Sequence, residues 1–185
     1  MAPSFSTPMK FMSFTILLLT IAIMISQSNG DQVAKPNQSQ TTLVFYLQAV
    51  ASGPDATSVA VIGVNGKVWS STTFGTIFVV DDPVHVGSSI TSQQVGRAQG
   101  LITAAALDGS NVHVALSVVF NNGQYGGSTI ELQGISRQRE KYREVSIVSG
   151  TGKFRYARGF ASFETVSSNP ATAHSVVRMT LNLLM

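Results

Sequence analysis

One stretch of the chain decides the fold class: Asp108-Gly109-Ser110-Asn111-Val112-His113-Val114-Ala115-Leu116-Ser117-Val118-Val119-Phe120-Asn121-Asn122-Gly123. Large apolar side chains recur at every second position from Val112 to Phe120, and this period of two is typical of a β-strand with one buried face. Asp, Asn and Gly at both ends of the stretch favour tight turns, because these residues tolerate the backbone angles that turns require. The stretch therefore predicts a strand over residues 111–120 between two short connections.

Strand-like segments fill most of the chain from Thr41 onward. The sequence predicts a hairpin turn at Asn65-Gly66, a strong hairpin signal, and the end of a strand at Asp82-Pro83, since Pro cannot donate to a sheet ladder. No segment shows a sustained helical period with capping residues at both ends. Evenly spaced strands with short turns predict an antiparallel sandwich or an up-and-down barrel. The other strands are expected over residues 41–51, 58–64, 67–70, 75–81, 93–106, 128–134, 143–149, 156–166 and 175–184.

Two runs combine glycine with arginine, Val95-Gly96-Arg97-Ala98-Gln99-Gly100 and Val148-Ser149-Gly150-Thr151-Gly152-Lys153-Phe154-Arg155-Tyr156-Ala157-Arg158-Gly159. Each run lies between apolar-alternating segments, so each marks a place where a sheet bends or lets another backbone approach closely. We expect Arg97 and Arg158 to hold these bends through contacts with carbonyl or carboxylate oxygens.

The composition favours a closed barrel. The chain contains no cysteine, so burial and hydrogen bonding must hold the domain together without disulfides, and a closed sheet leaves no loose edges. Several predicted strands are apolar on both faces. A barrel around a ligand cavity accounts for this if the inner faces line the cavity and the outer faces meet neighbouring subunits. We therefore expect a homo-oligomer.

Residues 1–30 have the features of a secretory signal peptide: a positive Lys10, an apolar stretch over residues 11–25, and small residues up to Gly30 for cleavage. The stretch is short for a transmembrane helix, and a retained signal anchor is the alternative. Residues 31–40 are expected to form a flexible segment with an N-glycosylation site at Asn37, and residues 41–185 to form the barrel domain. We expect a secreted protein without membrane contact after signal cleavage.

Charge and motif spacing exclude several classes of function. The chain carries 12 Lys and Arg against 9 Asp and Glu, and the basic residues of its C-terminal half are interleaved with acids, so a solvated face or a cell-wall contact is favoured over nucleic-acid binding. His85, His113 and His174 are isolated, so no metal site is expected. The run Gly150-Thr151-Gly152-Lys153 lacks the spacing of a phosphate-binding loop. No cofactor is expected.

A series of short blocks is specific when its order and spacing are taken together: Phe45-Tyr46-Leu47, Phe74-Gly75-Thr76, Asp81-Asp82-Pro83, 95–100, Gly127-Ser128-Thr129, Arg143-Glu144 and 150–159. With these blocks the mature chain resembles the plant dirigent family over essentially its whole length, and its defence-related branch in particular. The resemblance implies an all-β fold, an eight-stranded antiparallel up-and-down β-barrel of the allene oxide cyclase type with a central cavity. It also implies a protein of the apoplast that forms trimers, with a dimer as the alternative.

The resemblance further implies a function. A laccase or peroxidase makes phenoxy radicals from a monolignol such as coniferyl alcohol, and the dirigent protein orients two of them so that one stereoisomer of a lignan forms. Holding two reactants in one relative geometry replaces random collision. In some relatives the main reaction is the cyclisation of a quinone methide, which a pocket carboxylic acid assists by protonating its oxygen.

Residue-by-residue transfer from the family gives a mixed pocket. Ala49 and Ser136 stand where relatives carry acids, so both usual pocket acids are missing. The family's pocket arginine and threonine correspond to Arg143 and Thr165, and two wall positions correspond to Ile102 and Ala104.

For each of these residues a structural role is the alternative. Arg143 binds a ligand oxygen or pairs with Glu140 or Glu164. Thr165 lies in the pocket or is a plain strand threonine. For Ser136 a solvated turn residue is the favoured interpretation, and a hydroxyl offered to the substrate is the alternative. Tyr125 is expected to be an exposed loop aromatic rather than a cover for the barrel.

Asp81 and Asp82 are the only adjacent carboxylates of the chain. A strand-ending turn is the favoured interpretation of this pair, and the pair is also the first candidate to replace the missing pocket acids. The sequence thus supports a dirigent protein that directs phenoxy radical coupling in lignan metabolism and defence, without turnover of its own. The alternatives are a quinone-methide cyclase or isomerase, and a non-catalytic barrel that binds a phenolic compound or a glycan.

Overall fold

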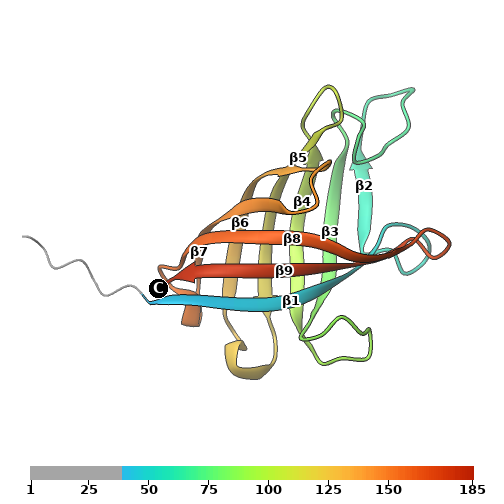
Figure 1. The fold of residues 1–185 in the computed structure, drawn as a ribbon. Helices are drawn as coiled ribbons and strands as arrows, with labels where there is room; N and C mark the ends of the chain where they lie inside the picture. The colour runs from blue at the N-terminus through green and yellow to red at the C-terminus, as the bar shows by residue number, and fades with distance from the viewer. Residues whose placement is uncertain (1–38) are drawn as a thin grey trace, which may run out of the picture. The chain divides into compact units, whose positions relative to one another are not determined.

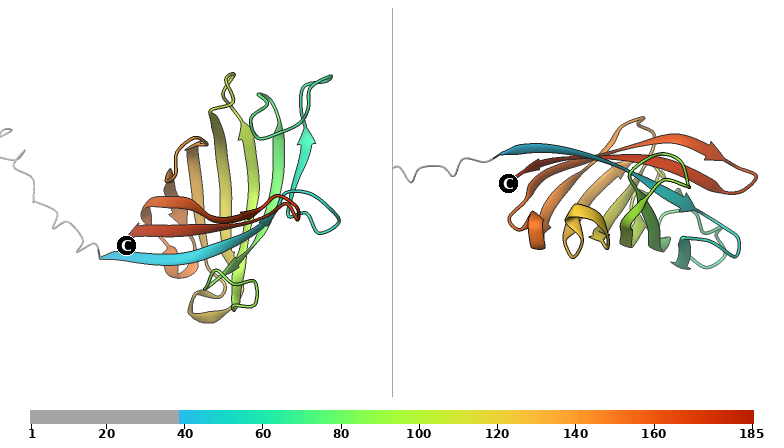
Figure 2. Two further views of the ribbon diagram at one scale, coloured as in Figure 1. Left: turned by 45° about the vertical axis from the view of Figure 1, so that its right-hand side comes forward. Right: turned by 90° about the horizontal axis from the view of Figure 1, so that it is seen from below.

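The computed structural model describes residues 39–185, and the predicted signal peptide and Asn37 lie outside this part of the chain. A single antiparallel sheet dominates it, in the order β1-β9-β8-β7-β6-β5-β4-β3-β2, and an additional pairing of β1 with β3 closes the sheet into a barrel (Figure 1). Figure 2 shows how β1, β8 and β9 cross in front of the central strands. The strands are β1 Gln40–Val50, β2 Ser58–Ile62, β3 Ile77–His85, β4 Gln94–Ala104, β5 Asn111–Phe120, β6 Thr129–Arg137, β7 Arg143–Gly150, β8 Arg158–Asn169 and β9 His174–Leu184.

The barrel has eight wall positions because β1 and β2 share one of them. Both strands pair antiparallel with the same edge of β3: β1 at Val84 and His85, and β2 over Ile77–Val80. Thr57 bridges the break, since its N–H donates to the Val50 carbonyl and its carbonyl accepts from Asp81 N–H. The prediction of an eight-stranded antiparallel up-and-down barrel is therefore confirmed.

The barrel interior follows the alternation read from the sequence. In β5 the side chains from Val112 to Phe120 are buried at every second position, as predicted. One end of the barrel is filled by aromatic rings from Phe45, Phe120, Tyr125 and Phe154, whose centroids lie 4.9–5.6 Å apart in contacting pairs. Tyr125 thus packs against the core, and the expectation of an exposed loop aromatic was wrong. The interior cavity lies toward the opposite end.

Two local predictions were wrong. Lys67 N–H does donate to the Val64 carbonyl across Asn65-Gly66, but residues 67–70 form no strand, so the turn leads into a loop instead of a hairpin. Asp82-Pro83 does not end a strand either, because β3 runs on to His85. Pro83 is tolerated there because its nitrogen, like that of Asp81, faces the edge shared by β1 and β2, at the junction where no ladder donor is needed.

Arg97 and Arg158 of the two glycine–arginine runs make the expected contacts with carbonyl or carboxylate oxygens. Arg97 contacts the carboxylate and the carbonyl of Asp81, and Arg158 donates to the Ala157 carbonyl. Within residues 39–185 the only helical turns are short 3₁₀ segments, η1 Gly123–Tyr125 and η2 Gly152–Phe154. None of the helical segments in this range has the length and apolar character needed to cross a membrane.

Gly159 is a position where the barrel has no room for a side chain. Its φ is +142°, and a Cβ added there would lie 1.9 Å from the carbonyl oxygen of Asn182 on the neighbouring strand β9. The strain of a positive φ in a residue with a side chain adds to the overlap between the new Cβ and the Asn182 carbonyl oxygen. Gly159→Ala is therefore expected to lower the free energy of unfolding by about 3 kcal/mol.

Denaturant unfolding followed by circular dichroism measures this loss. Gly126→Ala is the matched control, because Gly126 has a φ of −48° and its nearest neighbours would lie 3.5 Å from the added Cβ. Equal unfolding midpoints for the two variants would contradict the close approach at Gly159.

Candidate functional site

A cavity of about 510 Å³ lies inside the barrel, at the end opposite the aromatic cluster. Its walls come from the inward positions of the strands, and most of them are apolar or aromatic, as Phe78, Ile102, Val114 and Phe163 exemplify. Volumes of roughly 300–1,000 Å³ suit small organic ligands. The cavity can therefore hold a small organic molecule with its apolar part against hydrocarbon.

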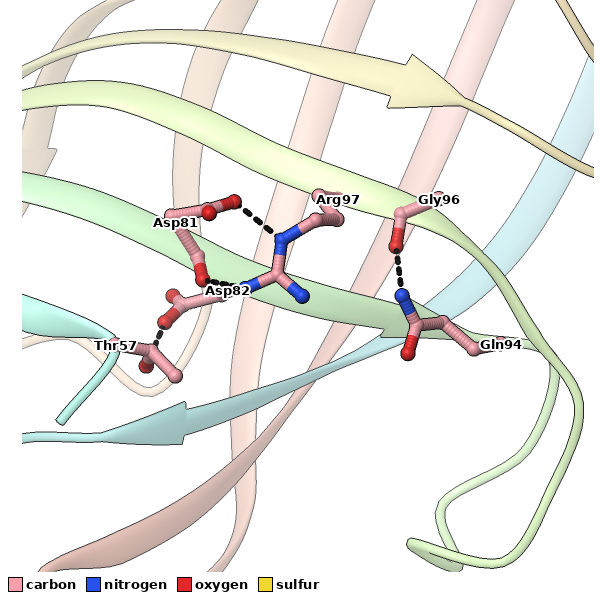
Figure 3. Close-up of polar contacts among 6 residues, drawn as sticks. All are labelled: Thr57, Asp81, Asp82, Gln94, Gly96 and Arg97. Atoms are coloured by element: carbon pink, nitrogen blue, oxygen red, sulfur yellow. Dashed lines mark hydrogen bonds and ion pairs between the residues drawn. The ribbon is translucent and has the colours of Figure 1, made fainter. Parts of the chain in front are cut away.

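Among residues 39–185, Asp82 is the only carboxylate that lines the cavity. Because β3 continues through Asp81 and Asp82, their side chains point to opposite faces of the sheet, and Asp82 shares the inward face with Val80. Its Oδ1 accepts a hydrogen bond from the Thr57 hydroxyl (Figure 3), and the Val50 N–H donates to that hydroxyl in turn. The carboxyl is thus anchored at the junction of β1 and β2.

Burial raises the pKa of the Asp82 carboxyl above its ordinary value of 3.8, to about 6. The neighbouring Asp81 raises this pKa as well, whereas the Thr57 hydrogen bond and the Arg97 charge oppose the shift. Around pH 6 both the protonated and the ionised form of the carboxyl are populated. Asp82 can therefore donate a proton in a mildly acidic to neutral solution.

Asp81, the other sequence candidate, lies on the outer wall. It pairs with Arg97, whose Nε is 2.5 Å from Oδ1, and it does not line the cavity (Figure 3). The structure thus separates the two adjacent carboxylates: Asp81 belongs to an ion pair on the outside of the barrel, and Asp82 belongs to the cavity.

Arg143 supplies the only positive charge of the cavity lining in the described part of the chain, residues 39–185. Its Nη2 donates to Thr165 Oγ1 at 2.9 Å, and its buried Nε has no hydrogen-bond partner among residues 39–185. Burial lowers the pKa of the guanidinium, which nevertheless stays charged at neutral pH. The two proposed carboxylate partners are engaged elsewhere, Glu140 with Arg137 and Glu164 with Arg178 and Lys141.

A ligand oxygen bound next to the unpartnered Nε of Arg143 would accept the hydrogen bond that this group lacks. A buried donor without an acceptor destabilises the protein, because the group has lost its water without replacement. Thr165 is exposed and lines the cavity, so the Arg143–Thr165 pair lies at the rim, where a guest can reach it.

The remaining sequence candidates divide into two groups. Ala49, Ile102 and Ser136 line the cavity together with the arginine and threonine, whereas Ala104 does not. Ala104 is buried under the segment that leads into β3, since its N–H donates to the Thr76 carbonyl and its carbonyl accepts from Gly75 N–H.

The favoured placement of Ser136 in a solvated turn was wrong. Ser136 is buried within β6, and its hydroxyl accepts from the Gln138 amide at 3.1 Å. Ser136 and Gln138 are thus among the neutral polar groups that line the cavity in addition to its two charged ones.

Sequence reasoning missed Trp69, Phe78, Gln138 and Phe163 as cavity residues. Phe78 and Asp82 could have been found together, because both share the parity of the buried Val80 once β3 is allowed to continue past Pro83. Trp69 belongs to a loop that no strand pattern places. Among residues 39–185, no group of three or more His, Cys, Asp or Glu side chains is arranged to hold a metal ion.

These observations define a class: a closed antiparallel β-barrel with a ligand-sized cavity that holds one titratable acid and one arginine at its rim. The family comparison agrees with it, because the model of the Dirigent-like protein family matches residues 40–184. The chain belongs to the dirigent family.

Individual relatives support the assignment. The chain is 36% identical to Dirigent protein 21 of Arabidopsis thaliana over 169 residues, which cover 89% of each protein. It is 33% identical to Pterocarpan synthase 1 of Glycyrrhiza echinata over 172 residues, or 90% of this chain and 92% of that protein. The solved structure of the pterocarpan synthase dirigent protein GePTS1 superposes with a TM-score of 0.72 at 32% identity, covering 80% of this chain and 85% of that one.

Asp82 is expected to make stability depend on pH. Its pKa in the folded protein lies above the unfolded value, so the folded state binds more protons between pH 3.8 and about 6, and stability falls as pH rises through that window. Asp82→Asn keeps an oxygen acceptor for Thr57 and removes the charge. Above the window this variant is expected to gain about 3 kcal/mol of unfolding free energy, the equivalent of a two-unit pKa difference.

Denaturant midpoints at about pH 4 and about pH 7.5 test this, since the difference between the two proteins should be small at the lower pH and largest at the higher one. A variant that is less stable than the wild type at the higher pH would refute a buried, ionised Asp82.

Proposed function

We propose that this protein catalyses the cyclisation of a phenolic quinone methide inside its barrel, with Asp82 as the general acid. The observation that carries the proposal is the position of Asp82: a carboxyl with a pKa of about 6 faces an otherwise mostly apolar cavity. Both acids that relatives carry are replaced here, by Ala49 and Ser136, so Asp82 is the cavity group that can supply the proton.

The proposed reaction is an isomerisation that balances without a redox partner. The hydroxyl oxygen of the substrate attacks the electrophilic methide carbon, which forms the new C–O bond, and the electron pair of the exocyclic C=C bond moves into the ring and onto the quinone oxygen. Asp82 protonates that oxygen, which becomes a phenol. The attacking hydroxyl releases its proton, and the Asp82 carboxylate takes it up again, directly or through water.

Arg143 and Thr165 have a positioning role in this proposal. Negative charge develops on the quinone oxygen as the ring becomes aromatic, and the fixed positive charge of Arg143 stabilises it. The unpartnered Nε of Arg143 is a donor for a second substrate oxygen. The apolar walls, such as Ile102 and Phe163, hold the ring and restrict its orientation.

The resemblance to relatives named pterocarpan synthase supports enzymatic turnover, because those proteins match this chain over most of its length. We further propose, from the family resemblance, that the protein is secreted to the apoplast after removal of residues 1–30, is glycosylated at Asn37, and forms a trimer or a dimer. Exposed apolar residues in register on the outer wall, Val59, Val79 and Leu101, support contacts between copies.

Asp82→Asn tests the catalytic role. With a quinone methide formed in situ from a phenolic benzylic alcohol that carries a second hydroxyl, the variant is expected to lose about 10²–10⁴-fold in kcat, as for the loss of a general acid. Chiral chromatography of the cyclic product measures rate and enantiomeric excess together.

Asp81→Asn is the matched control, because it removes the adjacent carboxylate on the outer wall, and its turnover is expected to stay within a few-fold of wild type. Unchanged turnover in Asp82→Asn, or no turnover in the wild type, would overturn the proposal.

Stereoselective coupling of phenoxy radicals is the second candidate. It is favoured by the unpartnered Arg143 Nε next to apolar walls, because capture and orientation of a radical need no proton donor. Coniferyl alcohol with an oxidase is expected to give an enantiomeric excess of the coupling product when the protein is present and a racemate when it is absent.

The same assay on Ala49→Asp asks whether an acid at the family position adds function, since Ala49 lines the cavity. A racemate with and without the protein would exclude coupling. Ligand binding without any product would leave a non-catalytic barrel for phenolic compounds.

A further inference from the structure

The loop between β2 and β3 reaches the open end of the cavity. Three consecutive residues of this loop, Trp69, Ser70 and Ser71, line the cavity, although they belong to no strand. The indole of Trp69 is 46% exposed, so one part of it faces the cavity and another part faces solvent. The chain has no other tryptophan.

The loop is fastened on the side that follows Trp69. Ser70 Oγ lies within hydrogen-bond distance of the Thr73 hydroxyl, at 2.8 Å, and the Ser70 carbonyl accepts from Thr73 N–H. Gly75 N–H donates to the Ala104 carbonyl and ties the loop to β4. Thr72 packs so closely on Gly109 that a Cβ added to that glycine would lie 2.5 Å from the Thr72 carbonyl oxygen.

The side that precedes Trp69 is held by packing against a glycine. A Cβ added to Gly63 would lie 2.5 Å from both Cδ1 and Nε1 of the indole, so the ring rests directly on the Gly63 backbone. Any side chain at this position would displace the ring. By contrast, the adjacent Val68 is 81% exposed and does not line the cavity. The loop thus fixes one aromatic ring at the rim and leaves its neighbour in solvent.

We propose that Trp69 is a specificity-determining residue: its indole, seated on Gly63, covers the aromatic ring of a guest that enters the barrel. The inference rests on the proposed function only for the class of guest. Offset stacking between two aromatic rings adds to the affinity that burial alone provides, and a saturated ring of similar size lacks this gain. Trp69 therefore selects aromatic guests over aliphatic ones, and Phe78 and Phe163 contribute further aromatic wall inside the cavity.

The experiment measures binding rather than turnover. Equilibrium dialysis of unoxidised coniferyl alcohol, and of a cyclohexyl alcohol with the same side-chain length, is performed with the wild type, Trp69→Ala and Trp69→Phe. Trp69→Ala is expected to bind coniferyl alcohol about five- to tenfold more weakly, and Trp69→Phe to recover most of the loss. The affinity for the cyclohexyl alcohol is expected to change less, so that the ratio of the two affinities falls.

Gly63→Ala and Val68→Ala complete the design. Gly63→Ala keeps the indole but displaces it, so it is expected to weaken coniferyl alcohol binding and to shift the fluorescence emission of the single tryptophan. Val68→Ala is the matched control, with affinity and emission unchanged. Unfolding midpoints identify any variant whose loss reflects folding instead.

Wild-type affinity in Trp69→Ala, equal losses for the aromatic and the saturated alcohol, or no binding of coniferyl alcohol to the wild type would each overturn the proposal. The result is independent of the catalytic proposal. A loss of turnover in Asp82→Asn with unchanged binding in Trp69→Ala would refute the role of Trp69 alone, and the reverse outcome would refute the general acid alone.

Discussion

The structure depends on the way the edge of β3 is shared between β1 and β2. The sheet closes only because β1 pairs with the end of β3 and β2 with its beginning, and Thr57 spans the interval between them. The Thr57 hydroxyl accepts from Val50 N–H and donates to the Asp82 carboxylate. One residue therefore links barrel closure to the protonation chemistry of the cavity, so the acid is placed by the same contacts that complete the wall.

The two charged residues of the cavity, Asp82 and Arg143, differ in how far hydrogen bonds compensate their burial. Asp82 is buried and has its pKa raised, and one hydroxyl partner offsets part of that cost. Arg143 stays charged, shares a single hydrogen bond with Thr165, and keeps a buried Nε without an acceptor. On the outer wall, by contrast, Asp81 and Arg97 form an ion pair. Among residues 39–185, the buried side-chain atoms without a hydrogen-bond partner are Thr76 Oγ1, outside the cavity, and Arg143 Nε, where a bound oxygen atom would supply the missing acceptor.

The alternation of Val112 to Phe120 sufficed to predict β5, and the same pattern predicted most of the barrel, since a period of two reports burial of one face directly. Prediction failed where a local turn signal competed with tertiary pairing. Asp82-Pro83 has the composition of a strand end, yet β3 continues because the break between β1 and β2 requires no hydrogen-bond donor at Pro83. The residues at positions 82 and 83 carry no information about that break. Ser136 was misplaced by a similar emphasis on local polarity. The position of Trp69 depends on a loop that packs on distant glycines, which no periodicity reports.

The aromatic cluster of Phe45, Phe120, Tyr125 and Phe154 fills one end of the barrel, and the cavity lies at the other end. Whatever enters past the rim must leave by the same way, so a product that still fits the interior blocks the arrival of the next molecule. Because entry and exit use the same opening, the rate of turnover depends on how strongly the product is retained. Two molecules that react with each other inside the barrel must enter one after the other.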